Sequence, residues 1–378
     1  MLPVERVARG KFLKPDGNDK LDHAGVINGL AHACFRNASL SFHSNLAKAA
    51  GTSDHATAIC SILFGQDPEG TAPSLDLFRY QGVAPQAEGD PARYLSLAVE
   101  MALLVGVLQV AMLYAVLRPL EARFPAEAWE SRGGTGVDVV YTLLHRLGVI
   151  PLAVFLLLTP LADAAAGWMR GHEITPINLD ALWPGVTDVP VVSFLVYLVV
   201  LDLLDYWLHR GQHRLRWWWA LHALHHSQRK MSFWTDDRNH LLDSLINDAI
   251  KAAAALAIGV EPAQFVGLVI AARVLESVQH ANLPWTYGPL RHLLVSPVYH
   301  RIHHAIGIGH EGRRQGCNFS VLFPLWDVVF GTADFRRAIE PTGIRDQLPP
   351  PQGSGHDYGD GFWRQQWLGL RRMIDPAA

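Results

Sequence analysis

The sequence predicts an all-α integral membrane protein in which about four spanning helices carry a histidine-rich helical cap on the cytosolic side. Three observations support this prediction. Hydrophobic residues make up 49% of the 378 residues and charged residues only 18%, below the roughly one quarter that is usual in soluble domains. Mean hydropathy is +0.11, which is low for a chain lying wholly in a membrane and indicates additional water-facing parts. Histidine, with 19 residues, is unusually frequent.

Charge and cysteine content exclude several classes of protein. The net charge of −3 provides no general basic field, so no nucleic-acid partner is expected. The three cysteines, Cys34, Cys60 and Cys317, are too few for a disulfide framework or for a cysteine-rich zinc or iron–sulfur module.

The composition predicts three parts. Residues 1–92 form an N-terminal extension of unknown role that ends in a stretch rich in glycine and proline, and its histidines lack ligand spacing. Residues 93–340 form a membrane domain that carries the histidine clusters. Residues 341–378 form a C-terminal tail with an aromatic helix at the membrane interface.

Apolar runs of about 20 residues or more define the expected spanning helices. The first, Tyr94 to Leu117, has 24 residues and one charge, Glu100, which suffices to cross about 30 Å of hydrocarbon. Two further runs cover Leu147 to Ala166 and Val189 to Leu208. A fourth region, Leu245 to Val278, predicts a hairpin of two shorter helices. Three such long runs are hard to hide in a soluble core, which disfavours a water-soluble bundle.

Basic residues predict the orientation in the membrane. The loop from Trp168 to Pro190 holds one basic residue, Arg170, whereas six follow the third run. By the positive-inside rule, the histidine-rich side faces the cytoplasm. These six residues are Arg210, Arg214, Arg216, Arg229, Lys230 and Arg238.

Eight histidines fall into three clusters with helical spacing. The first cluster is an HxxxH, and the second and third are both HxxHH. Residues three or four apart share one helix face, so each cluster presents its imidazoles together. The members are His209 and His213, then His222, His225 and His226, then His300, His303 and His304.

The chemistry of imidazole points to metal binding. Several imidazoles converging without a cation leave ring nitrogens without partners, and neutral imidazole suits Fe, Zn, Cu and Ni. Eight ligands exceed the coordination number of one ion, so two ions with about four imidazoles each fit the count. Asp202 and Asp205 precede the first cluster by about one or two turns and are candidates to accept the second N–H of a ligating histidine.

These segments resemble the fatty acid hydroxylase and sterol desaturase superfamily of membrane non-haem di-iron proteins. The resemblance covers roughly residues 137–376. It rests on DYWLHRGQH (205–213), HALHHS (222–227), QHAN (279–282), HRIHH (300–304), and the segment from Asn318 through Trp326-Asp327 to Phe330-Gly331-Thr332. Ser320 stands where the family usually has glycine, and Leu241 follows His240 where the family often has proline.

The resemblance implies a four-helix membrane bundle under a cytosolic cap that holds two iron ions. It implies a ninth ligand, His280, and places His240 near the site as a supporting residue. It also implies O2-dependent hydroxylation or desaturation of a C–H bond in a lipid or sterol-like substrate, so residues 93–340 would form a hydroxylase/desaturase-like domain. Because residues 1–92 lack a cysteine cluster and a cytochrome b5 signature, the electrons are expected from a separate reductase, ferredoxin or cytochrome b5-like donor.

Two other classes of function stay open. Zinc on three histidines with an open position activates water, which describes a membrane hydrolase, although the sequence contains no HExxH. The third class is a non-catalytic metal-binding membrane protein, although the helical spacing of the histidines is unlike a metal-buffering tract.

Overall fold

The computed structural model describes residues 91–129, 134–312 and 315–375, which belong to one compact unit. The predicted N-terminal extension, apart from its last two residues, lies outside the described residues. The prediction of an all-α protein is confirmed: the described residues contain ten α-helices, and their only β-type pairing is one isolated bridge between Ala305 and Thr342.

The helices follow one another along most of the described chain. They are α3 (Pro91–Arg123), α4 (Thr135–Arg146), α5 (Val149–Gly171), α6 (Pro190–Arg214), α7 (Arg216–His226), α8 (Leu241–Ala257), α9 (Pro262–His280), α10 (Pro297–His303), α11 (Leu325–Val329) and α12 (Phe362–Ile374).

Among the described residues, three helices are long and apolar enough to cross a membrane: Val99–Arg123 within α3, all of α5, and all of α6. None of the large apolar side chains of α5 is buried, and Leu157 and Leu161 are 63% and 67% exposed. Such continuous apolar surface is a contact surface for lipid rather than for water. The chain is therefore a membrane protein.

The fourth apolar region forms the predicted hairpin of α8 and α9. Gly259 adopts a positive φ of 68° at the turn, and Pro262 begins α9 at a position where no backbone donor is needed. The two helices have 17 and 19 residues, and neither meets the length and composition expected of a full span.

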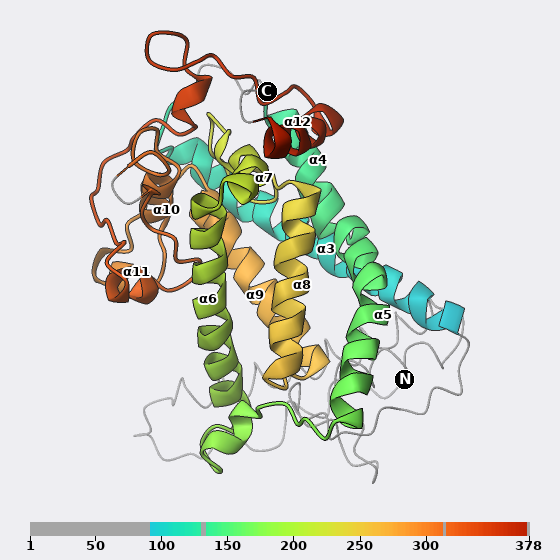
Figure 1. Ribbon diagram of the computed structural model, residues 1–378. Helices are drawn as coiled ribbons and strands as arrows, with labels where there is room; N and C mark the ends of the chain where they lie inside the picture. The colour runs from blue at the N-terminus through green and yellow to red at the C-terminus, as the bar shows by residue number, and fades with distance from the viewer. Residues whose placement is uncertain (1–90, 130–133, 313–314, 376–378) are drawn as a thin grey trace, which may run out of the picture. The chain divides into compact units, whose positions relative to one another are not determined.

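Helices α5, α6, α8 and α9 run alongside one another, and α7 and α10 lie together at one end of α6 (Figure 1). The last turn of α9 reaches the same end, where α9 packs against α10. This arrangement brings segments that are up to about 100 residues apart to one end of the bundle.

Helix α6 extends further than its apolar run. The run predicts an end at Leu208, but the helix continues to Arg214 because nothing in HRGQHR breaks a helix strongly. The first histidine cluster therefore stands on the membrane helix itself. Conversely, the run from Leu147 does not begin its helix there, because Gly148 has a φ of 84° and separates α4 from α5.

Candidate metal centre

The structure brings all nine predicted histidine ligands together in two neighbouring buried clusters. Within each cluster, the candidate ligand atoms lie within 4.8 Å of one another. We call them cluster 1, formed by His209, His213, His222, His226 and His303, and cluster 2, formed by His225, His280, His300 and His304.

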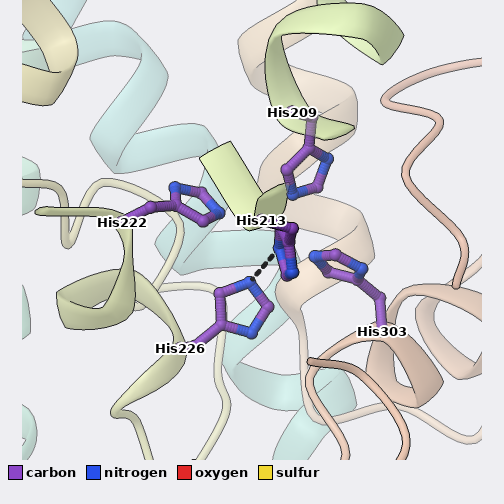
Figure 2. A group of neighbouring side chains, drawn as sticks. All are labelled: His209, His213, His222, His226 and His303. Atoms are coloured by element: carbon purple, nitrogen blue, oxygen red, sulfur yellow. Dashed lines mark hydrogen bonds between the residues drawn. The ribbon is translucent and has the colours of Figure 1, made fainter. Parts of the chain in front are cut away.

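The helical spacing distributes neighbouring histidines between the two clusters. His225 and His226 are adjacent on α7, yet His226 belongs to cluster 1 and His225 to cluster 2; His303 and His304 divide in the same way. Figure 2 shows the rings of cluster 1 converging from α6, α7 and α10. Each HxxHH thus serves both clusters, which places the two sites side by side.

Cluster 2 has more converging ring nitrogens than protons can satisfy. The Nε2 atom of His280 lies 3.2 Å from that of His225 and 3.0 Å from that of His300. The Nε2 of His300 in turn lies 3.1 Å from that of His304. A single proton bridges only one such pair, whereas one cation accepts all four lone pairs.

In cluster 1, three rings make a hydrogen bond to an oxygen through Nδ1, which we call the outer nitrogen of the ring. Nδ1–H of His209 donates to the carbonyl of Phe319, and Nδ1–H of His303 donates to the carbonyl of Cys317, both at 2.8 Å. Nδ1–H of His222 donates to Asp243 at 3.2 Å.

These outer bonds place the proton on Nδ1 and leave the Nε2 lone pair facing inward. The Nε2 atoms of His222 and His303 are buried and have no hydrogen-bond partner in the described structure. Buried nitrogen without a partner is costly, and this tautomer is the one that binds a metal through Nε2. The residues present therefore fit a metal ion.

Burial keeps five of the imidazoles neutral. Burial is the main cause that lowers the pKa of His226, His303 and His304 well below the ordinary value, and the neighbouring imidazoles add to it. The pKa values of His225 and His300 are lowered for the same reasons. At neutral pH these side chains are uncharged and their lone pairs are available to a cation.

Asp243 is a supporting residue that the sequence analysis missed. Its side chain is 2% exposed and also accepts hydrogen bonds from Gln212, Trp218 and Asn247. An acidic residue in the first turn of a helix is common, so only its contact with His222, 21 residues earlier, reveals the role.

The three residues predicted to support the ligands lie elsewhere. Asp202 accepts from the backbone N–H groups of Leu322 and Phe323 and from Trp326, and Asp205 pairs with Lys251 at 3.4 Å. The structure therefore does not support the predicted hydrogen bond from a ligating histidine to either carboxylate. Each carboxylate lies one or two helical turns before His209 and binds other partners instead.

His240 is also placed away from both clusters. Its Nδ1 caps α8 by accepting from the N–H of Leu242, and its Nε2–H donates to the carbonyl of Gln366 in α12. His240 therefore joins two helices, and its prediction as a residue beside the site is not supported.

Asp327 organises the loop that supplies the carbonyl of Phe319. Its buried carboxylate accepts from the N–H groups of Phe319 and Ser320 and from the hydroxyls of Tyr299 and Thr332, at 2.7 to 2.9 Å. The structural role of Asp327 thus includes positioning an acceptor for His209.

Comparison with known proteins agrees with the geometry. Residues 194–332 match the family model described as fatty acid hydroxylase, and this range contains all nine histidines. The chain carries a fatty acid hydroxylase domain.

Several relatives are similar to this domain. Alkylglycerol monooxygenase of Caenorhabditis elegans is 29% identical over 37% of this chain and 26% of its own length. Ornithine lipid hydroxylase of Rhizobium tropici is 26% identical over 58% of this chain and 63% of its own length. Methylsterol monooxygenase of Arabidopsis thaliana is 26% identical over 38% of this chain and 48% of its own length. The chain thus spans less than two thirds of these relatives. No solved structure matches it significantly.

Proposed function

We propose that the fatty acid hydroxylase domain catalyses the O2-dependent oxidation, by hydroxylation or desaturation, of a C–H bond in a membrane lipid or sterol-like substrate. The observation that carries this proposal is the pair of adjacent, buried, all-imidazole clusters at the end of a membrane bundle. The relatives named above are monooxygenases and hydroxylases, which supports the same class of reaction.

We assign one iron ion to each cluster, with the nine histidines as ligands. Bound there, the two ions would supply the oxidising power that an unactivated C–H bond requires, using O2 and electrons from an external donor. The chain's own contribution is to hold the ligands in one tautomer through the Nδ1 bonds of His209, His222 and His303. All nine rings are buried, which would keep bulk water away from the bound ions.

The histidine end of the bundle is proposed to face the cytoplasm. The basic residues beyond the third span surround this end, whereas Arg170, in the last turn of α5, is the only lysine or arginine from the start of α5 to the start of α6. A cytoplasmic site gives access to a soluble reductase, ferredoxin or cytochrome b5-like protein, which is the electron donor we propose.

The C-terminal tail is proposed to touch the membrane surface through α12. This helix buries Gln365, Gln366 and Arg372 against the protein and exposes Trp363 and Trp367, which are 77% and 62% exposed. An apolar face that points outward is typical of a helix at a lipid interface. The division into 1–92, 93–340 and 341–378 stays a prediction.

Metal content per polypeptide tests the proposal most directly. We expect detergent-purified protein to retain close to two iron ions by plasma mass spectrometry. His303→Ala should lose the ion of cluster 1 and His304→Ala that of cluster 2, since the two residues belong to different clusters. His292→Ala is the matched control, because His292 is exposed and belongs to neither cluster.

The same preparations should consume O2 and convert a lipid to a product with one more oxygen atom or a double bond when a reductant is supplied. His303→Ala and His304→Ala should lose this conversion and still insert into membranes. Two zinc ions together with lipid hydrolysis would replace the oxidase proposal by the hydrolase, and normal product from either variant would exclude the assigned site.

A further inference from the structure

The first turn of α7 contains three consecutive tryptophans with different surroundings. Trp217 is 41% exposed and Trp218 only 6%. Trp219 is half-buried and lies against the cluster 1 rings of His213 and His226. The metal centre described above gives Trp217 no role, although α7 carries three of the nine histidines.

The exposed and the buried indole are stacked on each other. The ring centroids of Trp217 and Trp218 lie 5.3 Å apart, and their planes are inclined by only 4°. Adjacent residues on a helix do not ordinarily face each other, so this arrangement is not a consequence of the helix alone. A parallel, offset stack is a favourable geometry for two aromatic rings. It brings the π system of the exposed indole into contact with that of the buried one.

The buried indole is in turn connected to cluster 1. Nε1–H of Trp218 donates to one carboxylate oxygen of Asp243 at 2.7 Å, and the other oxygen accepts from Nδ1–H of His222 at 3.2 Å. His222 belongs to cluster 1, and its Nε2 has no hydrogen-bond partner in the described structure. A continuous series of contacts therefore runs from the surface at Trp217 to a predicted metal ligand.

Such a series is suited to carrying electrons into a buried site. All nine histidines are buried, so a protein that donates electrons cannot touch ions held by them. The electron has to tunnel through the intervening protein, and the rate of tunnelling falls steeply with distance. Stacked aromatic rings and short hydrogen bonds couple a donor to an acceptor better than van der Waals gaps do, since they leave less open space to cross.

The surface where the series begins is both apolar and basic. Residues 214–217, which we call the α7 patch, are all exposed, and in them Leu215 and Trp217 alternate with two arginines. Residues 206–230 contain four arginines and one lysine but no acidic residue. Tryptophan and arginine are enriched where proteins bind one another, and a basic surface attracts an acidic partner. The α7 patch therefore suits an acidic protein.

We propose that the α7 patch docks an acidic protein that carries one electron at a time, and that Trp217, Trp218 and Asp243 conduct its electrons to cluster 1. The conduction rests on the proposed lipid oxidation at a di-iron centre, whereas the docking does not. Trp217 would then serve both purposes, because it is exposed to the carrier and stacked on the buried indole.

The electrons balance over one turnover. Oxidation of a C–H bond by O2 consumes two electrons and two protons. In a hydroxylation, one oxygen atom enters the C–OH group and the other leaves as water; in a desaturation, both leave as water. Each transfer oxidises the carrier by one electron and reduces the metal centre by one. The indoles are neither oxidised nor reduced, and no bond within them changes.

Binding of an oxidised carrier to the full-length, iron-containing protein tests the docking. The probe is the soluble haem domain of cytochrome b5, and the protein is held in nanodiscs of neutral lipid. We expect Trp217→Ala and Arg216→Gln to weaken binding of the probe about tenfold each. Trp183→Ala is the matched control, since Trp183 is 66% exposed but precedes α6, whereas the α7 patch follows it; its binding should equal that of the wild-type protein.

Reduction of the bound iron by the reduced probe, followed anaerobically by stopped flow, tests the conduction. Trp218→Phe loses the N–H and the larger ring, but Gln212 and Asn247 still donate to Asp243. We expect this variant to bind the probe normally, to retain its iron, and to be reduced by the probe about tenfold more slowly. Dithionite, which is small and needs no docking, should reduce the variant and the wild-type protein at equal rates. A general disturbance of the metal site would slow both reductants alike.

Trp219 offers the alternative route. It stacks on His310, with ring centroids 3.4 Å apart, and it touches the rings of His213 and His226 directly. If Trp219→Phe slowed reduction by the probe and Trp218→Phe did not, the electrons would enter there and the proposed conduction would be wrong.

The docking has its own contrary results. Absence of probe binding by the wild-type protein, or equal binding by Trp217→Ala, removes the carrier from the α7 patch. Binding in detergent but not in neutral-lipid nanodiscs would show that lipid headgroups cover the patch. Probe binding that depends on Trp217 in a protein that holds no iron would retain the docking surface and refute the oxidase function instead.

Discussion

At the scale of single residues, the Nδ1 atoms of the imidazoles matter as much as the Nε2 atoms, because their hydrogen bonds fix the tautomer and the orientation of each ring. His209 and His303 use backbone carbonyls, which cannot be altered by substitution, whereas His222 uses the carboxylate of Asp243. Because a carboxylate makes the imidazole a better ligand than a carbonyl does, Asp243 is the place where a single side chain controls the metal affinity of cluster 1.

We therefore expect Asp243→Asn to weaken metal binding at cluster 1 by about 10- to 100-fold. The measurement is the fraction of iron retained after dialysis against a graded series of chelator concentrations. Asp188→Asn, at an exposed position, should retain iron like the wild-type protein. Retention by Asp243→Asn equal to that of the control would show that the hydrogen bond to His222 does not tune the site.

At the scale of elements, the segment after α10 is held by two buried carboxylates. Asp202 of α6 binds the backbone at Leu322 and Phe323, and Asp327 binds it at Phe319 and Ser320. Residues 316–324 contain no helix or strand, so the backbone donors of this part of the segment depend on side chains. Its position in turn fixes the carbonyl that orients His209.

Asp327→Ala should destabilise the protein and disturb cluster 1 together. It leaves several buried donors without an acceptor, each costing about 1–3 kcal/mol, so we expect the free energy of unfolding to fall by about 3 kcal/mol or more. A decrease of roughly 6–12 °C in Tm follows for a domain of this size. Differential scanning calorimetry in detergent measures it, beside the exposed Asp360→Asn. An unchanged Tm would contradict this role for Asp327.

The elements could be predicted from the sequence better than their connections could. Apolar runs predicted α3, α5, α6 and the hairpin, helical spacing predicted eight histidines of the two clusters, and the family resemblance added His280. The break at Gly148 depends on a backbone conformation that the sequence pattern does not show. Asp243, Phe319 and Cys317 were missed because they meet their histidines only after the chain has folded. In all three contacts, the partner lies outside the helix that carries the histidine.

At the scale of the whole molecule, the two clusters join the ends of four helices. Histidines from α6, α7, α9 and α10 meet at one end of the bundle. The nine rings fill the space between these helix ends, and apolar side chains such as Leu221, Ile302 and Phe319 are buried around them. Metal ions in the clusters would therefore add to this apolar packing in holding the end together.

Removal of metal should accordingly lower the stability of the domain. A ligand that binds only the folded state stabilises it by about 4 kcal/mol at a concentration 1,000 times its Kd, which corresponds to roughly 10 °C in Tm at this chain length. We expect chelator to lower Tm by about that amount and added iron to restore it. The double variant His303→Ala, His304→Ala lacks one ligand in each cluster. Its Tm should be lower than that of the wild-type protein and should change neither with chelator nor with added iron. A chelator effect of equal size in that variant would place the stabilising metal elsewhere, because its two clusters are incomplete while the rest of the chain is unchanged.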